Sequence, residues 1–223
     1  MPSKAGVSKD GRRLRARMHI DPKSLSADES YKLMTGVVVP RPVAWVTTLS
    51  ESGGINLAPF STFTFVAPKP PMLAFSVGQR GGVYKDTARN ILATEEYVVH
   101  IADRPLIEAV HASAVEYPPE VSEVETLGLA TVPSLLVKPP RVEAAPIAME
   151  CRLRQCLEFG ETRSRLIVGE VVAFHFREGL IKGGKIDTRA LDPLCRLAGP
   201  NYATLGEIVA MQPIFQTAKT TVK

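Results

Sequence analysis

The chain has 223 residues, of which 45% are hydrophobic and only 6% are aromatic, so it can bury one large aliphatic core or two small ones, and no apolar run approaches the ~20 residues that cross a membrane. The formal charge of +4 is unevenly distributed along the chain, because residues 1–17 alone carry +5 and the rest carries −1. A nearly neutral body argues against a dedicated nucleic-acid surface on the fold. The three cysteines, Cys151, Cys156 and Cys195, have no C-x-x-C spacing, which argues against a disulfide scaffold or a thiolate zinc site and favours a reducing, cytoplasmic location.

The N-terminal residues predict a flexible extension in front of a single domain. Residues 1–20 are basic, and no apolar segment follows them as it would in a secretory signal. Contact of this tail with an acidic partner or a membrane surface is a minor alternative. Residues 21–223 are interpreted as one domain, which begins with a helix over Pro22–Gly36 that Ser26 or Asp28 could cap.

The stretch Pro40–Phe63 organises the rest of the chain. Val43–Leu49 alternates between residue types and is rich in β-branched residues, which predicts a half-buried strand. Ser50–Gly54 is a turn, and Ile55–Pro59 begins a return strand. Because proline lacks a backbone N–H, we expect the pairing to stop or bulge at Pro59.

Hydroxyl groups alternate with aromatic rings directly after this strand, at Phe60-Ser61-Thr62-Phe63. Unpaired backbone donors, small hydroxyls and flat apolar surface then occur within a few residues, and a phosphorylated planar ligand needs all three. Arg41 lies between two prolines on extended backbone and could bind a phosphate with two N–H groups. The plainer interpretations are an exposed loop arginine at Arg41, a core position for Trp45, and ordinary strand hydroxyls at Ser61 and Thr62.

The later elements alternate mostly between strands and turns. A long acidic loop is expected over Glu116–Ser134 and a polar loop over Leu197–Glu207, and the apolar Ile208–Phe215 could pack on the body or on a second subunit. This pattern favours a mainly β fold, a closed or nearly closed antiparallel β-barrel with peripheral helices, over a doubly wound parallel sheet. Helices are expected over about Lys85–Thr94 and Arg104–Val115. Strands are expected over Thr62–Val66, Met72–Val77, Tyr97–Ala102, Ile147–Glu158 and Arg165–Phe176, with Leu180–Ile186 as a further candidate.

The helix start at Lys85-Asp86-Thr87 is a candidate anion site. The first amides of a helix lack intrahelical partners and lie at the positive end of its dipole, and Lys85 adds a full charge. Asp86 or Thr87 could instead accept hydrogen bonds from those amides. Taken alone, an ordinary capped surface helix is the better interpretation.

Several common motifs are absent. Gly53-Gly54 and Gly81-Gly82 lack the spacing of a dinucleotide fingerprint, and the near phosphate loop Gly179–Lys185 is followed by Ile186 where a hydroxyl would bind magnesium. The four histidines have no metal-ligand spacing, so we expect no metal site. No serine lies in a G-x-S-x-G setting, which argues against a serine hydrolase.

Four ordered motifs between about Tyr31 and Glu207 together resemble the flavin reductase-like family, and flavoredoxin-type members in particular. The resemblance implies an FMN-binding split β-barrel, a Greek-key-like antiparallel barrel, that forms a homodimer with FMN bound non-covalently near the subunit interface. The motifs are Pro40-Arg41-Pro42-Val43-Ala44-Trp45-Val46-Thr47-Thr48, Asn56-Leu57-Ala58-Pro59-Phe60-Ser61-x-Phe63 with Pro70-Pro71, Lys85-Asp86-Thr87-x-x-Asn90-Ile91, and Arg196-Leu197-x-Gly199-x-x-Tyr202.

Roles follow from the resemblance by motif position. Thr47, Thr48, Ser61 and Thr62 would line the flavin and its phosphate; Asn56, Ala58 and Pro59 would approach the ring with backbone; Arg41, Lys85 and Thr87 would bind the phosphate; and Tyr202 would close the site. Trp45, Phe63 and Asp86 complete the predicted cofactor-binding set.

Since the flavin itself performs hydride and electron chemistry, no catalytic side chain is required. The implied activity is that of an NAD(P)H:FMN oxidoreductase, with NADH or NADPH as reductant and an unidentified electron acceptor. The alternatives are a flavin-binding electron carrier reduced by a protein partner, and a binding module of the same fold without flavin.

Overall fold

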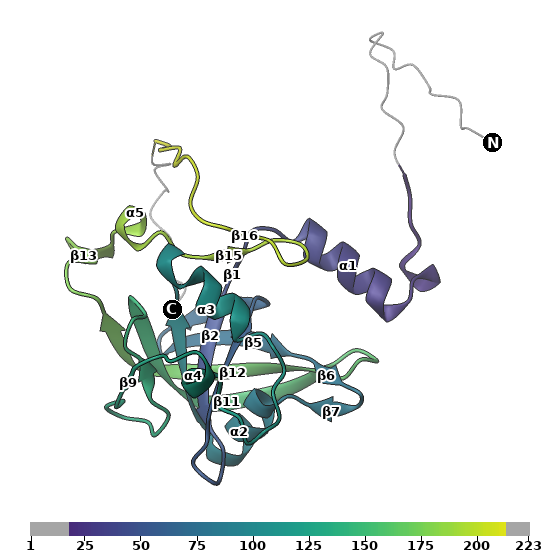
Figure 1. Ribbon diagram of the computed structural model, residues 1–223. Helices are drawn as coiled ribbons and strands as arrows, with labels where there is room; N and C mark the ends of the chain where they lie inside the picture. Colours follow the sequence, from purple (N-terminus) through teal and green to yellow (C-terminus); the bar gives the residue numbers. More distant parts are fainter. Residues whose placement is uncertain (1–17, 213–223) are drawn as a thin grey trace, which may run out of the picture. The chain divides into compact units, whose positions relative to one another are not determined.

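The protein is described from a computed structural model, which describes residues 18–212 (Figure 1). The described chain divides into two compact units, before and after the Val38–Val39 bond, and each is described by itself. Most of the predicted N-terminal extension and the end of the apolar segment Ile208–Phe215 lie outside the described residues. None of the described helices is long and apolar enough to cross a membrane.

The first unit contains a 3₁₀ turn, η1 (Pro22–Ser24), and helix α1 (Ala27–Val37). The predicted helix is therefore present but begins at Ala27, after a separate turn. Ser26 caps α1, because its hydroxyl accepts from the Glu29 amide at 3.2 Å while the Glu29 carboxylate accepts from the Ser26 amide at 2.8 Å. Asp28 is not the cap. It pairs instead with Lys32, one turn along the helix, at 2.7 Å.

The second unit is built on an antiparallel sheet of seven strands in the order β3-β2-β8-β11-β12-β5-β4. β3 and β4 follow each other in the chain, separated only by Ser61 and Thr62, yet they form opposite edges of the sheet. The strands are β2 (Ala44–Leu49), β3 (Ile55–Phe60), β4 (Phe63–Pro68), β5 (Pro71–Val77), β8 (Glu96–Ile101), β11 (Ile147–Phe159) and β12 (Ser164–Phe176).

One face of this sheet closes around a single core, which makes it a barrel split between β3 and β4. Phe60 on one edge strand lies with its ring centroid 5.1 Å from that of Phe75, next to the opposite edge. Tyr97 on β8 meets Phe75 edge-to-face at 5.7 Å. Residues from β2, β3, β5, β8, β11 and β12 are therefore buried in one cluster, and the predicted mainly antiparallel β-barrel is confirmed.

Short helices cover the barrel at defined places. Helix α2 (Asp86–Thr94) contributes Ala88 and Ile91 to the barrel core. Helices α3 (Ile107–Ala112) and α4 (Glu123–Thr126) cover the outer face of β2 and β3, where Trp45 and Leu57 form a second cluster. β2 has two different faces, with Val46 toward the barrel core and Trp45 toward the second cluster, but the expectation of a half-buried strand is wrong, because both faces are buried from Ala44 to Thr48.

The remaining elements are short. The expected helix over Arg104–Val115 is a 3₁₀ turn followed by α3. The candidate strand over Leu180–Ile186 is a hairpin in which each strand has only two residues. Three of the remaining strands form a small sheet: β1 (Arg41–Pro42), β15 (Cys195–Arg196) and β16 (Tyr202–Ala203). The other short elements are β6 (Gln79–Arg80), β7 (Val83–Tyr84), β9 (Thr131–Val132), β10 (Arg141–Val142), β13 (Ile181–Lys182), β14 (Lys185–Ile186), η2 (Arg104–Leu106) and α5 (Thr188–Leu191).

The expectation that pairing stops at Pro59 is wrong. β3 pairs with β2 through Pro59, which lies opposite Trp45, and on to Phe60, which lies opposite Ala44. The Leu57 amide points away from β2, since it donates to the Glu123 carboxylate at 2.9 Å. Pro59 lies two residues further along the same open side, so its missing N–H costs no ladder bond.

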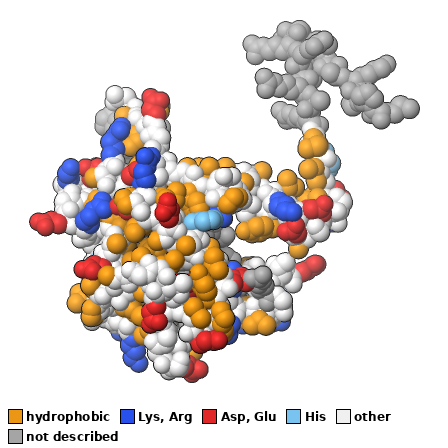
Figure 2. Space-filling model, viewed as in Figure 1, with side chains coloured by type: hydrophobic (Ala, Val, Ile, Leu, Met, Phe, Trp, Pro, Cys, Tyr) orange, Lys and Arg blue, Asp and Glu red, His pale blue; other side chains and the backbone are white. Residues whose placement is uncertain are grey.

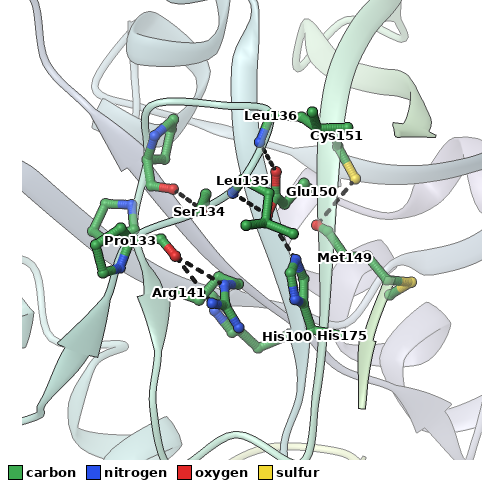
Figure 3. A network of polar contacts seen from close by, with 12 residues as sticks. His100, Pro133, Ser134, Leu135, Leu136, Arg141, Met149, Glu150, Cys151 and His175 are labelled. Atoms are coloured by element: carbon green, nitrogen blue, oxygen red, sulfur yellow. Dashed lines mark hydrogen bonds and ion pairs between the residues drawn. The ribbon is translucent and has the colours of Figure 1, made fainter. Parts of the chain in front are cut away.

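One buried carboxylate holds the loop between β9 and β10 (Figure 3). Glu150 on β11 is fully buried and accepts from the amides of Leu135 and Leu136 at 2.7 and 2.6 Å. His175 on β12 lies 2.7 Å from the same carboxylate. At the end of this loop, the Pro140 carbonyl accepts the Thr47 hydroxyl at 2.7 Å, which ties the loop to the barrel.

Replacing Glu150 with alanine should lower the free energy of unfolding by about 2–4 kcal/mol, because two amides lose a shared buried acceptor. Burial opposes ionisation of Glu150, but the Leu135, Leu136 and His175 donors together hold its pKa below the ordinary 4.5. Its stabilising contribution is therefore complete above pH 4.5 and is lost as the pH falls through the lower folded value.

Urea denaturation of Glu150→Ala and of Glu161→Ala, an exposed change in the β11–β12 turn, measures this difference. Equal stability of the two variants at neutral pH would contradict the role given to Glu150.

Candidate functional site

A cavity of about 210 Å³ lies where the open edge of β3 meets the start of α2. Its walls come from three parts of the chain: β3, the segment from β7 into α2, and the segment from the end of α3 to α4. The lining residues are Asn56, Ala58, Pro59, Phe60, Val83, Tyr84, Lys85, Asp86, Thr87, Ser113, Ala114, Val115, Glu116, Tyr117 and Glu123.

The start of α2 presents backbone amides to this cavity. Lys85 is the N-cap residue, with extended backbone, and no side-chain hydrogen bond caps the helix among the described residues. The expectation that Asp86 or Thr87 caps it is wrong, because the Asp86 carboxylate pairs with Arg89 and the Thr87 hydroxyl accepts from Asn56. The first turn therefore keeps donors that can bind an anion.

A polar network joins β2, β3 and α2 beneath the cavity. The Asn56 side-chain amide donates to the Thr87 hydroxyl at 2.9 Å and approaches the Thr48 hydroxyl at 3.3 Å. The Asn90 amide also donates to the Thr48 hydroxyl, at 3.0 Å. Since Thr48 and Thr87 are buried, the network fixes the α2 start against the open edge of β3.

The cavity wall carries one lysine and three carboxyl groups, which partly neutralise one another. Lys85 lies 3.5 Å from Glu116, and Asp86 pairs with Arg89 outside the cavity. Burial raises the pKa of Glu123 above its ordinary value, against the opposing effect of the Leu57 amide. The surface of the chain likewise mixes charges of both signs with apolar side chains on the face shown in Figure 2.

The structure brings together at the cavity six of the residues proposed from sequence: Asn56, Ala58, Pro59, Lys85, Asp86 and Thr87. Thr48 lies in the network beneath them. Trp45 is fully buried and donates its indole N–H to Ser113, a cavity residue, at 2.8 Å. Trp45 therefore supports the wall of the cavity from behind.

A second group of these residues lies outside the cavity lining. The Arg41 guanidinium donates to the Ser61 hydroxyl at 3.3 Å and to the Leu197 carbonyl at 3.0 Å. Tyr202 accepts from Arg196, whose guanidinium lies 4.5 Å from the centre of the Tyr202 ring. Arg41 and Ser61 are thus neighbours, as the phosphate hypothesis requires, but they are bonded to each other and do not line the cavity at Lys85.

The other proposed residues serve the barrel in this chain. The Thr47 hydroxyl is bonded to the Pro140 carbonyl, and the Thr62 carbonyl accepts from the Ser76 amide at 2.9 Å. Phe63 pairs with Phe75 across β4 and β5 and packs against the barrel core. No group of three or more His, Cys, Asp or Glu residues within the described chain could hold a metal ion.

Sequence reasoning missed the wall that follows α3. Ser113, Glu116, Tyr117 and Glu123 were read as part of a helix and an acidic loop. The one local signal was the turn Ser122-Glu123, which begins α4 and brings a carboxylate inward. Which strand edge that carboxylate meets is a long-range property that the sequence does not display.

Comparison with known proteins gives consistent matches to a family model, to a relative and to solved structures. A family model described as the flavin reductase like domain matches residues 35–190. An uncharacterized protein of Halalkalibacterium halodurans is 41% identical over 199 residues, which cover 87% of this chain and 95% of the relative.

Two solved structures are also similar over nearly their whole length. Nitrilotriacetate monooxygenase component B from Bacillus cereus is 40% identical, with 89% of this chain and 100% of that chain covered and a TM-score of 0.86. The 2-nitrobenzoate 2-nitroreductase of Pseudomonas fluorescens is 33% identical, with 91% and 100% covered and a TM-score of 0.81.

Proposed function

The chain belongs to the flavin reductase-like family, and from that premise we propose that it binds FMN and reduces it with NADH or NADPH. The observation that carries this proposal is the uncapped start of α2, with Lys85 beside it, opening into a cavity along an unpaired strand edge. Backbone amides, a cation and apolar wall then occur together, which suits a ligand with a phosphate at one end.

The residues present fit such a ligand at its phosphate end. The amides of Asp86 and Thr87 and the Lys85 ammonium would bind the phosphate, and Lys85 would exchange its contact with Glu116 for that contact. Ala58 and Phe60 offer small and flat apolar surface next to it. Bound FMN would supply the hydride and electron chemistry, so the chain's own task is to bind, orient and shield the ligand.

The size of the cavity supports a homodimer. A volume of about 210 Å³ is below the range of roughly 300–1,000 Å³ that is usual for ligand pockets, so this chain encloses only part of an FMN molecule. We propose that a second copy covers the remainder. The group around Arg41, Ser61 and Tyr202 would then be available to the ligand from either copy.

The electron acceptor is proposed by class alone. One similar protein is named as a monooxygenase component and another as a nitroreductase, which favours an acceptor outside this chain, either a partner enzyme or a small aromatic molecule. A flavin-binding carrier reduced by a protein partner is the competing hypothesis.

Purified protein mixed with FMN should show bound-flavin absorption, and anaerobic NADH or NADPH should bleach it. Stopped-flow absorbance measures both steps. Bleaching with dithionite but not with either nicotinamide would favour the carrier over the reductase. Absence of any FMN binding would refute both.

Replacing Lys85 with alanine should weaken FMN binding about tenfold, because one charge-assisted contact to the phosphate is lost. Riboflavin lacks the phosphate, so its affinity should change little. Fluorescence titration of both ligands measures the difference, with Lys182→Ala on β13 as the matched lysine control. Equal losses for FMN and riboflavin would contradict a phosphate role for Lys85.

A further inference from the structure

We propose that Glu123 is the group through which flavin binding takes up a proton, because it faces the bound phosphate end of FMN as a neutral carboxylic acid. This inference rests on the proposed function, since it assigns the phosphate to the cavity at the start of α2. It adds a ligand-facing residue and a proton to that binding step.

The geometry places Glu123 inside the cavity wall. It is the first residue of α4 and is only 7% exposed. One carboxyl oxygen accepts from the Leu57 amide at 2.9 Å, on the open edge of β3. Leu57 lies between Asn56 and Ala58, which both line the cavity, so the carboxyl group is held beside the ligand-facing edge.

Among the described residues, no cation forms an ion pair with Glu123, as the charged and titratable groups around the cavity show. From the α2 side these groups are Lys85, which lies near Glu116, and Asp86, which pairs with Arg89. β3 contributes none. From β7 and the segment after α3 come the phenols of Tyr84 and Tyr117, and on α4 itself Glu125 is exposed.

An ionised Glu123 would oppose phosphate binding. Two like charges within one partly buried cavity repel by an amount that changes affinity roughly ten- to hundredfold. Burial already raises the pKa of Glu123, and a nearby phosphate would raise this pKa further. In the neutral form one oxygen still accepts from Leu57, and the O–H becomes a donor toward the cavity.

The test is the affinity for FMN between pH 5 and pH 9, measured by fluorescence titration for the wild type and for Glu123→Gln. Glutamine keeps an acceptor for Leu57 and a donor for the cavity, but it cannot ionise. The ratio of the wild-type Kd to the Glu123→Gln Kd should rise roughly ten- to hundredfold with pH and then level off. The phosphate ionises in both complexes, so the ratio reports only what the ionisation of Glu123 adds to binding.

Glu125→Gln is the matched control, because it removes the same charge from the exposed side of α4 and should follow the wild-type pH profile. Calorimetry in two buffers of different ionisation enthalpy measures the proton uptake directly. The uptake by wild-type protein, after subtraction of the uptake measured with Glu123→Gln, should be greatest between the pKa of Glu123 in the free protein and its higher pKa in the FMN-bound protein, and should decline above the latter.

A ratio that stays constant across the pH range, or no net proton uptake, would overturn the role of Glu123 while leaving FMN binding intact. Failure of wild-type protein to bind FMN at any pH would overturn the proposed function, and this inference with it. The two failures are therefore distinguishable.

Discussion

The contact between Asn56 and Thr87 joins the two backbones that form the cavity, and the remaining features of the site depend on it. Asn56 belongs to the edge strand β3, and Thr87 belongs to the first turn of α2. This contact positions the helix start against the edge strand. The amides of the first turn remain available because the N-cap residue is Lys85, whose side chain cannot accept a hydrogen bond.

The start of α2 and the open edge of β3, two of the three parts of the chain that line the cavity, have backbone groups without a partner in their own helix or sheet. An uncapped helix start forgoes about 1 kcal/mol of capping energy, and an open strand edge exposes its donors and acceptors. Helix α2 remains in place because Ala88 and Ile91 are fully buried in the barrel core. On the open edge of β3, Pro59 has no backbone N–H to satisfy, and the Leu57 N–H donates to the Glu123 carboxylate. The cavity therefore combines polar groups at the start of α2 with apolar surface along β3, and the elements behind it are well packed.

The parts of this arrangement that the sequence reveals are those with a local cause. Alternation over Val43–Leu49 predicts a strand with two different faces, and the helix start at Lys85 is visible from the residues that follow it. The edge position of β3 is not local, so Pro59 was misread as an interruption, when it marks the unpaired side. Likewise, no local pattern shows that Glu123 meets β3, or that Arg41 and Ser61 bond to each other.

Hydrogen–deuterium exchange with and without FMN is the measurement that tests the central claim most directly. The account predicts that FMN slows exchange in the peptides that contain Asp86 and Thr87 and those of the segment 114–123, while the Glu150-bound loop between β9 and β10 is unchanged. Slowed exchange at a different helix start or strand edge, with the amides of α2 unaffected, would contradict it.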